Sequence, residues 1–118
     1  MIYLASPYSH EDPDVREARY VQICEIAARL IYNGVKIFSP IAHTHPIAKY
    51  GVLNDQPAKF WLDLDKDILK NANGLWLCTM DGWKQSSGMK EELFFARELY
   101  IPSIYIDPET LELTHEGA

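Results

Sequence analysis

Two carboxylates of the chain occupy positions where a helix presents apolar side chains. A helix turns by about 100° per residue, and on that wheel Asp65 projects into the apolar stripe of a helix predicted over residues 58–72. Glu92 falls near the apolar face of another predicted helix, residues 88–100, in its first turn. An inward carboxylate costs free energy unless a partner compensates it. Each position therefore indicates either a paired structural carboxylate or a functional one.

The position of Glu92 near a helix start indicates which chemical role the carboxylate could have. A helix N-terminus stabilises an ionised carboxylate, and an ionised carboxylate is what a nucleophile requires. We therefore expect a functional site that contains both carboxylates, with Glu92 as a nucleophile or an electrostatic stabiliser. The open alternative is that each carboxylate is paired with an arginine or a backbone amide.

Hydroxyls and free amides gather where the same helix opens, at Ser86, Ser87 and Gly88. Such a helix start suits an oxyanion, ideally a phosphate, although a plain serine N-cap is the alternative. Trp83 lies in the preceding loop and is the candidate to cover a flat base.

The sequence gives little support for a metal site. His43 and His45 stand two residues apart, but zinc needs further ligands at suitable spacing. Cys24 and Cys78 lie in apolar runs and are predicted to be buried free thiols of a reducing compartment. We expect neither a metal nor a cofactor.

Strands alternate with helices along the chain. The predicted strands cover residues 2–5, 35–39, 75–79 and 103–106, and the predicted helices cover 13–33, 58–72 and 88–100. Segment 40–58 is predicted as a long loop with at most one short helical turn, and Leu111 and Leu113 could add a short edge strand. The alternation predicts one α/β domain over residues 1–118, Rossmann-like and flavodoxin-like, with four or five strands in a parallel sheet and helices on both faces.

Ligands of such sheets bind beyond the C-terminal ends of the strands. The loops over residues 6–12, 40–57 and 80–87 therefore matter most for function.

Composition limits the partners and the compartment. The chain has 118 residues, a formal net charge of −6 and a hydrophobic fraction of 47%. An acidic chain argues against a nucleic-acid backbone as partner. The first residues lack a basic region followed by a long apolar stretch, and no apolar run approaches the roughly 20 residues of a membrane span. We expect a cytoplasmic protein that binds neither a membrane nor nucleic acid.

A family resemblance covers roughly residues 2–106. Residues 2–8, Ile-Tyr-Leu-Ala-Ser-Pro-Tyr, resemble the first strand and loop of the nucleoside 2-deoxyribosyltransferases and the related 2′-deoxynucleoside 5′-phosphate N-glycosidases. Asp65 stands eight residues before Asn73, as an aspartate of that superfamily does before the next strand. The superfamily's spacing around its catalytic glutamate is matched by Ser86, Gly88, Glu92 and Ala96. The chain looks closest to a branch of small bacterial and phage proteins of this superfamily without an assigned activity.

The resemblance implies a Rossmann-like enzyme that acts on a nucleoside or nucleotide. Glu92 would attack C1′ and form a covalent glycosyl intermediate, Tyr3 would orient Glu92, and Asp65 would contact or protonate the base. The loop after the first strand would contact substrate, together with the start of the helix over 88–100. Those substrate-binding residues are Ser6, Pro7, Tyr8, Ser9, Trp83, Ser86, Ser87 and Gly88.

The resemblance also bears on the substrate and on the assembly. The transferases have an aspartate where this chain has Ser86, whereas the nucleotide hydrolases have a serine there, which favours a 5′-monophosphate. The resembling families are dimers or larger, so we expect at least a homodimer. Alternatives that remain are a transferase acting on free nucleosides, a nucleotide-binding domain without catalysis, and a structural protein of the same fold.

Overall fold

The computed structural model describes residues 1–51 and 58–115 and contains a five-stranded sheet. The strands are β1 (Ile2–Ala5), β2 (Ile37–Phe38), β3 (Gly74–Cys78), β4 (Ser103–Ile106) and β5 (Leu113–Thr114). They lie in the order β2-β1-β3-β4-β5; the first four are parallel and β5 pairs with β4 in the antiparallel direction. The predicted parallel α/β sheet with flavodoxin-like strand order is confirmed.

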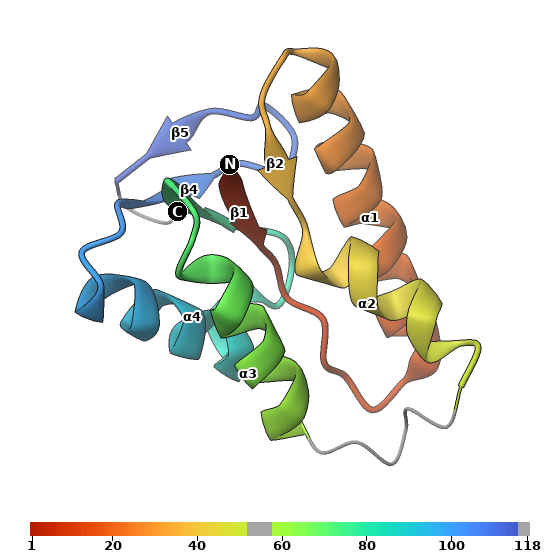
Figure 1. Ribbon diagram of the computed structural model, residues 1–118. Coiled ribbons are helices and arrows are strands. Elements are labelled where there is room, and N and C mark those ends of the chain that lie inside the picture. The colour runs from red at the N-terminus through yellow and green to blue at the C-terminus, as the bar shows by residue number, and fades with distance from the viewer. Residues whose placement is uncertain (52–57, 116–118) are drawn as a thin grey trace.

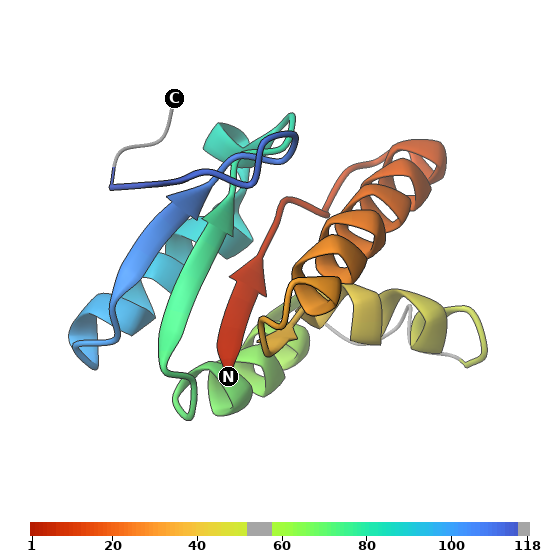
Figure 2. The same cartoon turned by 90° about the horizontal axis from the view of Figure 1, so that it is seen from above.

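Among the described residues, four α-helices and one short 3₁₀ helix lie between the first four strands (Figure 1). They are α1 (Pro13–Tyr32), α2 (Pro40–Ala48), α3 (Ala58–Leu69), η2 (Trp83–Gln85) and α4 (Ser87–Glu98). Helix α1 packs on one face of the sheet and α3 and α4 pack on the other, as the view from above shows (Figure 2). The prediction of helices on both faces is therefore confirmed.

Each strand divides its side chains between two cores. Along β1, Leu4 joins the core beneath α1, whereas Tyr3 and Ala5 join the core beneath α3 and α4. This division follows from the two-residue period of a strand. Tyr3 thereby brings a hydroxyl into the interior on the side of α4.

The prediction of a loop over residues 40–58 is wrong for its first half, because residues 40–48 form α2. Ser39 caps this helix by accepting a hydrogen bond from the Ala42 amide at 3.1 Å, and Pro40 occupies the first turn, where its missing N–H costs nothing. Pro46 lies inside the helix, which is two and a half turns long. Residues 52–57 of the predicted loop lie outside the described residues.

Two element ends differ from the prediction for local reasons. Strand β2 keeps only Ile37 and Phe38 because Val35 closes the end of α1 with a bond to the Leu30 carbonyl, and Ser39 caps α2. Helix α3 ends at Leu69, not at residue 72, and its last turn tightens into bonds between residues three apart.

The sheet has a switch point between β1 and β3. The chain passes from β1 to β2 on one side of β1 and then crosses back to β3 on the other side, so the direction of strand addition reverses here. Ligands of open α/β sheets bind beyond the carboxyl ends of the strands at such a point. Within the described ranges, no helix is long and apolar enough to cross a bilayer.

Candidate active site

The centre of the candidate site is a carboxyl group that the fold buries on α4. Glu92 is only 6% exposed and lies on the inner face of the helix with Met89 and Ala96. The hydroxyl of Tyr3, a fully buried residue of β1, donates a hydrogen bond to Oε2 of Glu92. The two residues are 89 positions apart in the chain, so only the packing of α4 on the sheet brings them together.

Burial controls the charge of Glu92. Burial raises the pKa of this carboxyl to about 8. The hydrogen bond from Tyr3 lowers the pKa, and the charge of Asp65 raises it. Burial also raises the pKa of the Tyr3 hydroxyl far above its usual range. Tyr3 therefore stays protonated and can only donate to Glu92.

The expectation of a helix-start effect on Glu92 is wrong. Helix α4 begins at Ser87, which puts Glu92 in its second turn, and the first turn holds no acidic residue. The field of a helix end fades within one turn. Desolvation therefore outweighs it, and the free protein holds Glu92 mostly neutral at pH 7.

Asp65 belongs to the same neighbourhood. It lies half-buried on α3, on the face that carries Ile68 and Leu69, and both of these residues pack in the core beneath α3 and α4. Burial raises the pKa of Asp65 to about 6. The Asp65 charge in turn raises the pKa of both Tyr3 and Glu92, so the three groups form one electrostatic cluster.

The loop after β1 supplies further polar groups at the switch point. Ser6 is 6% exposed, and within the described part of the chain its Oγ has no hydrogen-bond partner. Pro7 is fully buried. Tyr8 places its hydroxyl 2.6 Å from Nδ1 of His45. Ser9 is exposed, and its carbonyl oxygen accepts a hydrogen bond from Arg19 at 3.0 Å.

The N-terminus of α4 has a serine cap and free space beside that cap. Ser86 is the N-cap, and its Oγ accepts from the Met89 amide at 3.2 Å. The next residue, Ser87, is exposed. A Cβ added at Gly88 would meet only the Ser86 Oγ, at 3.9 Å. The protein itself therefore does not require a glycine at 88, and the missing side chain leaves room beside the cap.

Trp83 forms part of the wall of this region. It lies in η2 and packs edge-on against Tyr105 of β4, with 5.5 Å between ring centroids. Lys84 places its ammonium 5.6 Å from the centre of the Trp83 ring. The ring is half-buried against the core beneath α4, so one part of it remains accessible.

Three residues of this edge were not predicted: Glu17, Arg19 and His45. His45 was considered only as a metal ligand, and the interaction with Glu17 of α1 depends on the unpredicted helix α2. Arg19 donates to the carbonyls of Tyr8 and Ser9 and also lies against Gly82, which has a φ of 91°. The Asp81-Gly82 turn was the available signal for that contact.

Two hollows mark the surface near these residues. One, of about 300 Å³, lies between α1 and the loop after β3 and is lined by Asp14, Val15, Ala18, Arg19, Gln22 and Asp81. The other, of about 390 Å³, lies at the end of α2 and is lined by Pro46, Ile47, Tyr50 and Gly51. Neither is lined by Glu92 or Asp65, so the chemistry of the carboxylates, and not a hollow, defines the site.

The histidines and cysteines have other surroundings. His43 packs near the Phe38 ring, whereas His45 bonds Tyr8 and Glu17. Cys24 is half-buried, Cys78 is buried, and both are free thiols. Across residues 1–51 and 58–115, no three His, Cys, Asp or Glu side chains are arranged to hold a metal ion.

A family model described as a domain of unknown function, DUF1937, matches residues 1–105. The chain belongs to this family. The matched span contains Tyr3, Asp65 and Glu92 together with the loops around them. No curated protein matches the chain. The family's description names no activity, so the chemistry of the site has to support the function.

Proposed function

We propose that the protein cleaves or exchanges the N-glycosidic bond of a 2′-deoxynucleoside or its 5′-monophosphate. The observation that carries the proposal is the buried Glu92 carboxyl. It accepts a hydrogen bond from Tyr3, and the charge of Asp65 raises its pKa. A carboxyl held by one donor has a fixed direction of attack, which a nucleophile needs. A second acid with a raised pKa can supply the proton for the leaving base.

The reaction has two steps, as in retaining glycosidases. First, a Glu92 oxygen forms a bond to C1′ while the bond from C1′ to the base nitrogen breaks, and that electron pair stays on the base. Neutral Asp65 gives the departing base a proton. Then water attacks C1′, the bond to Glu92 breaks, and the Asp65 carboxylate takes the proton of the water. A second base in place of water would give transfer from the same intermediate.

The start of α4 supports a monophosphate as substrate. Backbone amides at a helix start have no partner inside the helix and favour an anion. The open space at Gly88 and the Ser86 hydroxyl stand at this place. In the same way, the buried Ser6 Oγ after β1, which has no hydrogen-bond partner among residues 1–51 and 58–115, offers a polar contact to a ligand.

A nucleotide-binding role without catalysis is the competing function. It would use the start of α4 and would need no buried carboxyl on the inner face of that helix. Burial of Glu92 with its raised pKa is costly to the fold, and this cost favours the enzyme.

The test is base release from a panel of deoxynucleosides and deoxynucleoside 5′-monophosphates, followed by chromatography. We expect release from at least one monophosphate, and a fall by orders of magnitude in Glu92→Gln, which keeps the shape and removes the nucleophile. Glu98→Gln is the matched control, because Glu98 lies exposed on the same helix. Mass spectrometry of the quenched reaction should find the sugar on the peptide that contains Glu92.

Full activity of Glu92→Gln on every substrate would reject the mechanism. Absence of base release and base exchange, combined with thermal stabilisation by a monophosphate, would select the binding role instead.

A further inference from the structure

A chain of hydrogen bonds joins three elements beside the proposed site. The Tyr8 hydroxyl, in the loop after β1, lies 2.6 Å from Nδ1 of His45 on α2. Nε2 of the same ring lies 2.5 Å from Oε2 of Glu17 on α1. This is the arrangement in which one group orients a histidine and the histidine orients a third group. The proposed reaction uses neither His45 nor Glu17.

The chemistry of the partners determines where the protons lie. The hydrogen bond from His45 and the neighbouring Lys49 lower the pKa of Glu17, so its carboxylate is ionised and can only accept. Nε2 of His45 must therefore carry a proton. In the neutral ring Nδ1 then has none, and the Tyr8 hydroxyl donates to it. The Tyr8 oxygen keeps its lone pairs for a further contact.

The surroundings hold this arrangement in place. His45 is 7% exposed, and its ring stacks on Tyr20 of α1 with 4.2 Å between centroids. The charged groups that face the chain are Glu17, with Lys49 at 3.2 Å from its carboxylate, and Arg16, whose charge acts on Tyr8. Tyr8 itself is only half-buried, so its oxygen can meet a ligand.

We propose that His45 and Glu17 are positioning residues that act through Tyr8, and that they present the Tyr8 oxygen as a hydrogen-bond acceptor to a hydroxyl or amino group of the ligand. The proposal rests on the proposed function for the kind of ligand, a nucleoside or nucleotide. Its structural basis is independent: Tyr8 stands two residues beyond Ser6, whose buried Oγ lacks a partner among the described residues, at the switch point of the sheet.

The first test needs no activity. In protein labelled with ¹⁵N at its histidines, the ring spectrum at pH 8 should show His45 neutral and protonated at Nε2. A neutral ring protonated at Nδ1, or a doubly protonated ring at this pH, would overturn the proposal. This readout decides on the hydrogen-bond chain even if no nucleotide is cleaved.

The second test uses kinetics on the best deoxynucleoside monophosphate of the panel. Tyr8→Phe and His45→Phe should each raise KM about tenfold, because each variant loses one hydrogen bond to the ligand. The value of kcat should change little. The double variant should be no worse than either single one, because both remove the same contact. His45→Asn keeps an acceptor near the place of Nδ1 and should restore most of the affinity.

His43→Asn is the matched control, since His43 is exposed on the same helix. Additive losses in the double variant, or no recovery of affinity in His45→Asn, would reduce His45 to a structural residue. If no substrate is cleaved, the proposed function fails while the spectrum still decides on the chain.

Discussion

Glu92 and Asp65 carry raised pKa values for the same reason, loss of solvent, but to different extents. The attack needs Glu92 ionised and Asp65 neutral, whereas pKa values of about 8 for Glu92 and about 6 for Asp65 place a single proton mainly on Glu92. The reactive form is therefore the minor one, in which the proton has moved to Asp65. The pair therefore works while it holds one proton, and its titration steps belong to the pair.

This arrangement predicts a bell-shaped pH dependence. For kcat/KM of base release, we expect an acid limb near pH 6, below which both carboxyls are neutral, and a basic limb near pH 8, above which both are ionised. Initial rates at low substrate between pH 5 and 10 measure both limbs. Activity that stays flat across this range would contradict the assignment of the two roles.

The same carboxyls predict that stability falls as the pH rises. Both folded pKa values lie above the ordinary values of 4.5 and 3.8, so the folded protein binds more protons than the unfolded chain. Their contribution is complete below about pH 4 and is lost as the pH rises through 6 for Asp65 and 8 for Glu92. Glu92→Gln should therefore raise Tm at pH 9 by roughly 5 °C and change it little at pH 4.

Thermal unfolding at these two pH values, with Glu98→Gln as control, measures the effect. A Glu92→Gln protein that is less stable than the native one at pH 9 would show that the Tyr3–Glu92 bond, and not desolvation, dominates.

At the scale of the elements, a substitution at the start of α4 should change the stability of the fold and the binding of a ligand in opposite directions. Gly88 has space for a Cβ and does not adopt a positive φ, and alanine favours a helix by about 1 kcal/mol over glycine. Gly88→Ala should stabilise the fold by up to that amount. It should also weaken binding of a deoxynucleoside monophosphate about tenfold, because the methyl group occupies the approach to the cap.

Urea unfolding and a binding titration with the same variant measure the two effects. Stabilisation together with unchanged monophosphate binding would exclude this helix start as the phosphate site.

The elements also show how far sequence reasoning reaches. Hydrophobic periodicity located the four parallel strands and three long helices, because apolar spacing is a local property of the chain. It marked Asp65 and Glu92 as inward-facing for the same reason. Helix α2 was missed because its prolines suggest a loop, while Pro40 in fact suits the first turn of a helix. His45 and Glu17 could not be predicted as partners, because α2 had to be placed against α1 first.

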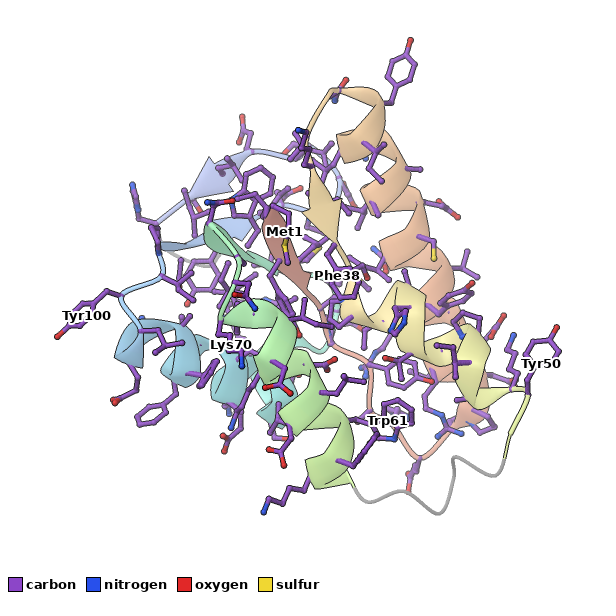
Figure 3. The ribbon with its side chains drawn as sticks, in the orientation of Figure 1. Met1, Phe38, Tyr50, Trp61, Lys70 and Tyr100 are labelled. Atoms are coloured by element: carbon purple, nitrogen blue, oxygen red, sulfur yellow. The ribbon has the colours of Figure 1, made fainter. Side chains whose placement is uncertain are left out.

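At the scale of the whole molecule, the apolar surface of α3 and α4 predicts self-association. Phe60 on α3 and Phe94 on α4 are 47% and 65% exposed, and Leu99, the C-cap residue of α4, is 45% exposed. Large apolar side chains exposed close together are usually covered by a partner. Tyr50 and Tyr100 also point outward, at opposite ends of the molecule (Figure 3). We expect at least a homodimer.

Light scattering coupled to size exclusion tests this state, and Phe94→Lys should shift it towards the monomer without unfolding the protein. A native protein that remains monomeric at high concentration would contradict the prediction.

Arg19 of α1 links the loop after β1 to the loop after β3 through its contact with Gly82. Arg19 holds the carbonyls of the loop after β1 and fills the space where a side chain at position 82 would stand, and the positive φ of Gly82 excludes most other residues. A change at either position affects the first loop: a larger residue at 82 would displace the Arg19 side chain, and a shorter residue at 19 would lose the hydrogen bonds to the carbonyls of Tyr8 and Ser9. Among relatives of this fold, positions 19 and 82 should be inherited as a pair, and a chain that has lost one should have rebuilt both loops.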